Sequence, residues 1–151
     1  MFQYILIGII IIGFTVTIQA YGTFYWSKRM ISKIYQVSDT SFNKGIVRIL
    51  ISTGAFLLIL HFIESFIWAI AYYLLPGITE FDTLEKAIYF SLVTFTTLGY
   101  GDITISSHFR ILSGLEAING ILLLGWSTTM MLTIMQHFWD RIERHNNKDN
   151  Q

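Results

Sequence analysis

The chain has 151 residues, of which 53% are hydrophobic and 13% are charged, whereas roughly a quarter of residues are charged in ordinary soluble domains. The formal net charge is zero, so the charge balance gives no support for a general attraction to nucleic acid. Cysteine is absent, which excludes disulfides and cysteine-based metal sites, and the composition as a whole indicates a membrane protein.

The first expected element is an uncharged apolar segment over residues 2–26. About 25 residues at a rise of about 1.5 Å reach about 37 Å, which is enough to cross a hydrocarbon core of about 30 Å. A signal peptide is the alternative, but the segment lacks a basic start, and Tyr25-Trp26 is more typical of an interfacial anchor than of a cleavage site. We therefore expect an N-terminal transmembrane helix over residues 1–26.

A basic linker follows over residues 27–45. Its charged residues are Lys28, Arg29, Lys33, Lys44 and the single acid Asp39. Apolar residues recur at helical spacing from Met30 to Val37, which permits a helix lying along the lipid headgroups. A soluble loop fits the composition equally well, and both interpretations remain open.

Two further apolar runs flank a more polar segment. We expect an outer helix over residues 46–75, closed by Pro76-Gly77, and an inner helix over residues 110–139, followed by a short tail over residues 140–151. Between the two runs, the capping-box pattern Asp82-Thr83-Leu84-Glu85 opens an apolar stretch and predicts a short helix over residues 83–95. A short helix and an irregular strand that enter and leave on one side form a re-entrant loop, which is tolerated only where it lines a water-filled path.

The distribution of basic residues predicts the orientation. Lys and Arg concentrate on the cytoplasmic side, so the segment from Lys28 to Arg48 should be inside and the N-terminus outside. The re-entrant loop then faces outside, and the tail returns to the cytoplasm. Aromatic residues are expected in interface belts at both boundaries, namely Tyr25, Trp26 and Trp139 inside and Tyr72 and Tyr73 outside.

The re-entrant segment contains the sequence TTLGYGD, residues 96–102. Glycine adopts positive φ as readily as negative φ, so Gly99 and Gly101 allow consecutive backbone carbonyls to point to one side, which an ordinary strand does not allow. A glycine-tyrosine-glycine turn alone is a weak signal, because such turns are common in loops. Its position after a capped short helix, between two spanning segments, makes it specific.

TTLGYGD resembles the selectivity-filter signature of potassium channels, and outer helix, re-entrant pore helix, filter and inner helix is the order of the pore domain in that family. The run before the filter is more similar to two-pore-domain leak channels than to voltage-gated ones, and one motif in the chain is typical of prokaryotic or viral members. The resemblance implies that the carbonyls of Thr97, Leu98, Gly99 and Tyr100, with the Thr97 hydroxyl, replace the water shell of K⁺. It also implies a homotetramer, because one chain supplies only one side of the ring.

The sequence departs from the family pattern at two positions around the filter. Leu98 replaces the commoner Val or Ile, and Val93 stands where some bacterial channels carry a Glu that pairs with the filter Asp. We therefore expect filter support from packing and from a hydrogen bond between Asp102 and a neighbour. The expected supporting residues are Tyr89, Phe90, Val93, Thr96, Tyr100, Gly101 and Asp102.

The inner helix contains Gly114, Gly120 and Gly125, although glycine costs about 1 kcal/mol relative to Ala in a helix interior. Close helix packing is our interpretation for Gly114 and Gly125. Gly120 lies where inner helices of the family often bend, so packing and a hinge are both open there. Helical spacing from Gly120 gives the expected axis-facing residues of the cavity and gate, which are Ile121, Leu124, Thr128, Leu132 and Gln136.

Three ionisable residues lie inside expected membrane helices. His61 and Glu64 are three positions apart and share a face of the outer helix, and Glu116 lies in the inner helix. Such groups are expensive in a membrane and usually find partners, so we predict that they form one polar network. It is either a proton-sensitive element or a static set of interhelical hydrogen bonds.

Together these features predict an all-α membrane protein with three transmembrane helices, a re-entrant pore helix and a filter. The expected function is passive, potassium-selective conduction through a homotetramer, with a non-selective cation channel or a pore subunit of a K⁺ uptake system as alternatives. No enzyme motif is recognisable, and no series of arginines indicates a voltage sensor. We expect K⁺ ions in the filter, no organic cofactor and no nucleic acid partner, in a cell membrane such as the bacterial inner membrane; a regulatory partner is left open.

Overall fold

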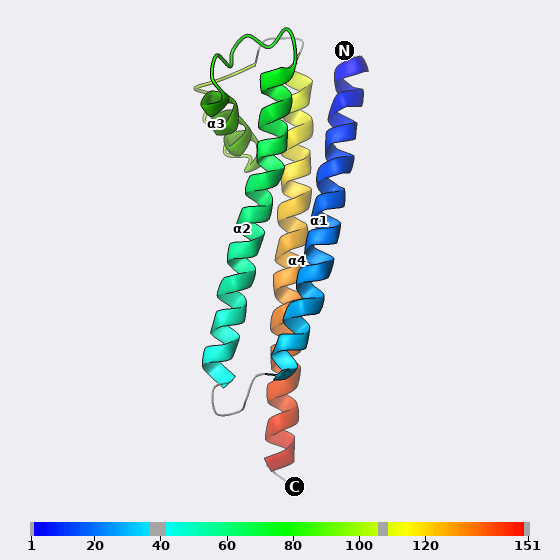
Figure 1. The fold of residues 1–151 in the computed structure, drawn as a ribbon, viewed down its shortest axis with the longest axis vertical. Helices are drawn as coiled ribbons and strands as arrows, with labels where there is room; N and C mark the ends of the chain where they lie inside the picture. Colours follow the sequence, from blue (N-terminus) through cyan, green and yellow to red (C-terminus); the bar gives the residue numbers. More distant parts are fainter. Residues whose placement is uncertain (1, 37–41, 106–108, 150–151) are drawn as a thin grey trace.

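The computed structural model describes residues 2–36, 42–105 and 109–149, which fold into four α-helices without a strand in these ranges. The helices are α1 (Phe2–Gln36), α2 (Phe42–Leu74), α3 (Leu84–Phe95) and α4 (Arg110–Asp149). α1, α2 and α4 are long and apolar enough to cross a membrane, and α2 runs antiparallel to the other two (Figure 1). The short α3 lies at the end of the bundle where α4 begins. The predicted all-α membrane fold is therefore confirmed.

The first helix does not end at Trp26. α1 continues through Gln36, because no glycine or proline interrupts residues 27–36. Met30 and Ile34 of this extension are buried together with Met130, Ile134 and Phe138 of α4. The apolar residues at helical spacing thus face α4, so the soluble loop is wrong for residues 27–36, where the structure has a helix. Val37 and Asp39 lie outside the described residues.

The other helix boundaries also differ from the expected ones at the end of the bundle opposite α3. α2 begins at Phe42 rather than at residue 46, and α4 continues to Asp149 rather than ending at residue 139. Polar and basic residues mark where a helix leaves the lipid, but they do not stop it. At the α3 end, α2 ends at Leu74 and α4 begins at Arg110, close to the predicted positions.

α3 begins as its sequence indicates, with one difference in the capping residue. The hydroxyl of Thr83, which has an extended backbone, accepts a hydrogen bond from the Lys86 backbone N–H at 3.4 Å. Asp82 instead pairs with the Lys86 ammonium group at 2.7 Å. Thr83 is thus the N-cap, and the exposed Asp82 adds a surface ion pair one helical turn from Lys86.

The bundle has two buried apolar clusters. One surrounds α3 and contains the rings of Trp68, Tyr72, Phe81, Phe90 and Phe95. The other lies toward the opposite end and joins α1, α2 and α4. Two aromatic residues that we expected in interface belts belong to these clusters instead. Tyr72 is buried, and Trp26 stacks on Phe56 with 4.2 Å between the ring centroids.

α4 crosses the end of α3 at Gly120. A Cβ atom at this position would lie 1.9 Å from the Phe95 carbonyl oxygen, so only glycine lets the two backbones approach this closely. α4 is nevertheless continuous through Gly120. At Gly114 and Gly125 no atom of the described chain outside the local helix lies within 4 Å of such a Cβ, so the packing predicted for these two is not made within the chain.

We expect Gly120→Ala to destabilise the protein by about 1–3 kcal/mol, because the added methyl group overlaps a backbone oxygen that cannot rotate away. Thermal unfolding in detergent measures the effect. Gly125→Ala is the matched control, and it should keep or slightly raise the stability, since alanine is the better helix former. Equal unfolding temperatures for the two variants would contradict the close contact.

Candidate ion-conducting site

The TTLGYGD turn is fixed to the end of α3 through its backbone N–H groups. The amides of residues 96–99 donate to carbonyls at positions 92–94, with distances of 2.9 to 3.2 Å. These bonds satisfy carbonyls that the end of a helix leaves without partners. In the described part of the chain, no backbone hydrogen bond uses the carbonyls of residues 97–100 as acceptors. The turn therefore uses the N–H groups of residues 96–99 internally and leaves the carbonyls of residues 97–100 without a backbone donor in the described chain.

The backbone of the turn alternates in the sign of φ. Thr97, Gly99 and Gly101 have φ values of 60°, 54° and 77°, whereas Leu98 and Tyr100 are not among the positive-φ residues. When φ alternates in sign along the chain in this way, successive peptide groups turn to the same side. Positive φ is the conformation expected for the two glycines. It is uncommon for a β-branched residue and costs of the order of 1–3 kcal/mol at Thr97.

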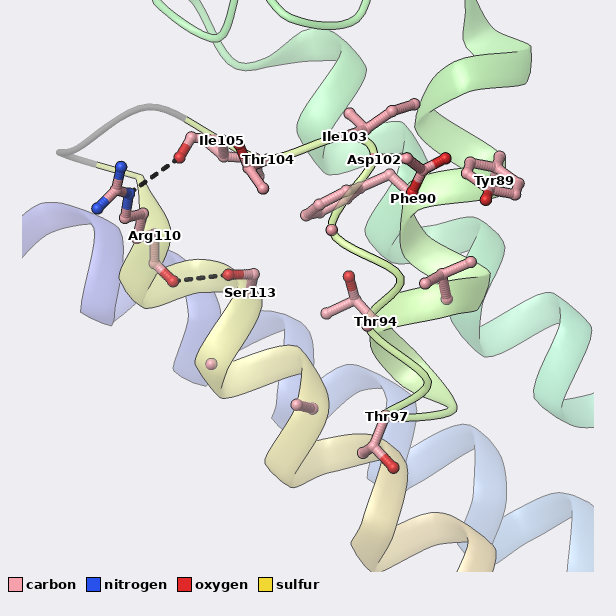
Figure 2. A pocket seen from close by; sticks show the side chains of 15 residues that line it. Tyr89, Phe90, Thr94, Thr97, Asp102, Ile103, Thr104, Ile105, Arg110 and Ser113 are labelled. Atoms are coloured by element: carbon pink, nitrogen blue, oxygen red, sulfur yellow. Dashed lines mark hydrogen bonds between the residues drawn. The ribbon is translucent and has the colours of Figure 1, made fainter.

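The side chains of the turn reach away from the chain's own core. Leu98 is 57% exposed and Tyr100 is 66% exposed. Behind them, Phe90 is buried in the cluster around α3. We expected a hydrogen bond between Asp102 and a neighbour, and in the structure this neighbour is Tyr89. The Tyr89 hydroxyl donates to the Asp102 carboxylate, which raises the pKa of Tyr89 above its ordinary value. Figure 2 shows these two side chains next to each other at the edge of the site.

A cavity of about 540 Å³ separates the turn from α4 (Figure 2). Side chains of α3 and the turn form one wall, and Ser113, Gly114 and Ala117 of α4 form the other. Arg110 lies at its rim, where the guanidinium donates from Nε to the Ile105 carbonyl at 3.2 Å. Arg110 thus links the start of α4 to Ile105, a role that its position at the start of a helix did not reveal.

The expected axis-facing residues of α4 lie on a face that the rest of the chain leaves largely open. Ile121 is 62% exposed and Leu132 is 55% exposed. Thr128 and Gln136 are also exposed, and Leu124 is half-buried. The other face of α4, which includes Asn119, Leu123 and Ser127, is buried. The described part of the chain thus leaves this face of α4 largely uncovered.

The membrane ionisable residues form two clusters rather than one. His61 contacts Glu64 through Nδ1 and Ser127 through Nε2, both at 2.9 Å. Glu116 instead accepts from Tyr72 at 2.7 Å and contacts Ser91 at 2.5 Å. Tyr72 comes 11 residues after His61 and Glu116 comes 11 before Ser127, so the two levels follow the antiparallel register of α2 and α4 and lie about 16 Å apart.

Glu116 connects three helices directly behind the site. Its partners come from α2 (Tyr72) and from α3 (Ser91), and the Ser91 hydroxyl also reaches the Ser65 carbonyl at 2.5 Å. A hydroxyl has one proton, so Ser91 donates to only one of its two acceptors at a time. The second contact is satisfied when the Glu116 carboxyl group supplies a proton. Ser91 and Tyr72 are the supporting residues that sequence reasoning missed, and their antiparallel register with Glu116 is the signal that identifies them.

We expect Glu116→Gln to keep the stability of the protein, because an amide both donates to Ser91 and accepts from Tyr72. Glu116→Leu leaves two buried hydroxyl groups without this partner and should cost about 1–3 kcal/mol. Thermal unfolding in detergent distinguishes the variants. If glutamine is as destabilising as leucine, the proton assignment is wrong.

A family model described as an ion channel matches residues 58–137, which include the last part of α2, the whole of α3 and the turn, and most of α4. Neither the curated proteins nor the solved structures provide a match to the chain. The matched region covers more than half of the chain and coincides with the helices that build the site. The chain therefore belongs to this ion channel family and carries its membrane-embedded pore domain.

Proposed function

We propose that the protein is a potassium-selective channel, in which four identical chains surround one axis and K⁺ passes through passively. The carbonyl oxygens of Thr97, Leu98, Gly99 and Tyr100 and the Thr97 hydroxyl coordinate dehydrated K⁺ ions. The proposal rests on one observation about this turn. The amides of residues 96–99 bond to α3, while the carbonyls of residues 97–100 have no backbone donor in the described chain. Oxygens held in this way replace a hydration shell without competing for internal hydrogen bonds.

Two further features favour a cation at this position. The turn leaves α3 at its C-terminal end, where the aligned peptide dipoles carry partial negative charge. The exposed Leu98 and Tyr100 side chains and the open face of α4 provide apolar surface for neighbouring subunits. A fourfold arrangement gives these surfaces partners and closes the ring of oxygens at the same time.

The position of the basic residues supports an orientation. The C-terminal part of α1 and the start of α2, which carry Lys28, Arg29, Lys33, Lys44 and Arg48, lie at the end of the bundle opposite α3 (Figure 1). Basic ends face the cytoplasm, so the N-terminus and the filter are outside and the C-terminus is inside. A cell membrane, such as the inner membrane of a bacterium, is the proposed location.

Two alternatives share this architecture. A non-selective cation channel has the same helices but a filter that does not discriminate K⁺ from Na⁺. A pore subunit of a K⁺ uptake system also uses such a unit, although its family repeats the unit several times within one chain, and the present sequence contains one GYG. The positive φ at Gly99 and at Gly101 favours the selective channel, since it fixes the direction of successive carbonyls.

We expect Gly99→Ala to abolish K⁺ flux in liposomes, because a side chain at φ 54° strains the turn and reorients its carbonyls. Tyr100→Ala should lower the flux strongly, since it removes an apolar side chain proposed to pack between subunits. The measurement is K⁺-driven flux reported by a pH-sensitive dye in the presence of a protonophore. Gly13→Ala is the control: Gly13 is exposed in α1, and a Cβ there meets no described atom within 4 Å outside its local helix.

Wild-type flux that Gly99→Ala leaves intact would remove the turn from the conduction path. Reversal potentials in mixed K⁺ and Na⁺ separate the alternatives: a value that follows the K⁺ gradient supports selectivity, and a value near zero supports the non-selective channel.

We also expect the purified protein to have about four times the mass of one 17.5 kDa chain. Native mass spectrometry from detergent measures this mass, because one chain contributes one strand of oxygens and a coordinating ring needs several. A monomer or dimer as the largest species that conducts would contradict the proposed ring.

A further inference from the structure

α1 lies outside the region that the family model matches, yet it packs along the proposed inner helix from Leu112 to Arg141. The family match begins at residue 58, so the pore domain of the family does not account for α1. α1 contacts both α2 and α4, and its buried polar residues Thr15, Gln19 and Thr23 recur every fourth position on one face. Such a face contacts protein rather than lipid.

On the filter side of Gly120, α1 is bonded to α4 through Asn119. The Asn119 amide donates from Nδ2 to the Thr15 hydroxyl at 2.8 Å, and both residues are buried. Closer to the N-terminus of α1, Gly8 lets this helix approach Leu115 of α4. A Cβ atom at Gly8 would lie 2.5 Å from the Cδ1 atom of Leu115. α1 is therefore in direct contact with the half of α4 that precedes Gly120.

On the other side of Gly120, α1 is bonded to α4 through Gln19. The Gln19 amide donates from Nε2 to the Ser127 hydroxyl at 2.8 Å and lies 3.3 Å from the Leu123 carbonyl. Ser127 in turn contacts His61, which ties the same point to α2. Farther along, Met30 and Ile34 pack in the cluster that contains Met130 and Ile134, and Arg141 donates to the Ile34 carbonyl.

We propose that α1 is a splint for the inner helix: it is fixed to α4 on both sides of Gly120 and thereby keeps α4 straight across this glycine. Glycine lowers the local resistance of a helix to bending. A bend at Gly120 that carries the second half of α4 away from the axis separates the Gln19 amide from Ser127 and from the Leu123 carbonyl and leaves it without these acceptors in apolar surroundings. α1 thus favours the straight helix, in which Leu132 of each subunit narrows the inner mouth.

The splint rests on the proposed function, because it assigns α1 a role in opening the same pore. Gln19 and Thr15 are positioning residues in this proposal, since they do not contact the ion path. Loss of the splint should therefore change how often the channel opens, but not its conductance when open or its ion selectivity.

We expect Gln19→Leu to raise the open probability of single channels in planar bilayers by at least about fivefold, because the loss of the Gln19–Ser127 bond changes the equilibrium constant of opening about fivefold in each of the four subunits. Unitary conductance and reversal potential should match those of the wild type. Ser127→Ala removes the same bond with a smaller change in volume, together with the contact between Ser127 and His61, and should act in the same direction. The control is Thr17→Val: Thr17 is exposed on α1, and its hydroxyl bonds to the Gly13 carbonyl within that helix at 2.7 Å.

A second measurement does not require conduction. The chain has no cysteine, so Tyr35→Cys and Gln136→Cys give two unique spin-label sites on exposed positions of α1 and α4. Gln136 lies 16 residues beyond Gly120, about 24 Å along the helix, so a rotation of about 10° at the glycine moves it sideways by about 4 Å. With labelled subunits diluted in unlabelled protein, Gln19→Leu should broaden the distance distribution and add longer distances, whereas Thr17→Val should leave it unchanged.

The splint is overturned if Gln19→Leu and Ser127→Ala behave like Thr17→Val in the spin-label distances, or if they do so in the open probability of conducting channels. A wild-type protein that conducts no K⁺ overturns the proposed function instead. In that case a broadened distribution still supports the mechanical role of α1, so the two failures are distinguishable.

Discussion

The arrangement of this protein depends on the hydrogen bonds from the amides of residues 96–99 to the end of α3. They attach one side of the turn to α3 and leave the carbonyls of residues 97–100 without backbone donors in the described chain, so the position of α3 sets the position of these oxygens. The surrounding contacts act on α3. Gly120 lets α4 press against its last carbonyl, and Glu116 and Ser91 connect it to α4 and α2. A short helix of 12 residues, too short to be stable alone in water, is held in place by these contacts.

Much of the helix order could be predicted because its signals are local. The Pro76-Gly77 break and the Thr83 cap fix the ends of α2 and α3, and the long apolar runs fix the spanning helices. The ends of α1 and α4 at the basic side could not be placed in this way. Charged residues there indicate the edge of the lipid, whereas the helices continue beyond it because Met30 and Ile34 have apolar partners on α4.

The site was predictable in part for a similar reason. Positive φ at Gly99 and Gly101 follows from the residue type, but nothing in the threonine side chain indicates the same conformation at Thr97, which the bonds to α3 impose. The partners of Glu116 depend on the register between two helices. We predicted one network for Glu116, His61 and Glu64 from their chemistry alone, without their depth in the bundle. The register of α2 and α4 places Glu116 on a different level from His61 and Glu64. Tyr72 shows the same effect, since its aromatic ring fits an interface belt while its hydroxyl has a buried acceptor.

The length of α4 has a geometric consequence. Glu143 lies 23 residues beyond Gly120, which is about 35 Å along the helix axis. A rotation of about 10° at the glycine would therefore displace this end sideways by about 6 Å, while atoms next to Phe95 hardly shift. This displacement exceeds the thickness of the first water layer around an alkali ion. α4 therefore moves least beside the end of α3 and most at its C-terminal end, so small changes of angle at Gly120 become large displacements at Glu143.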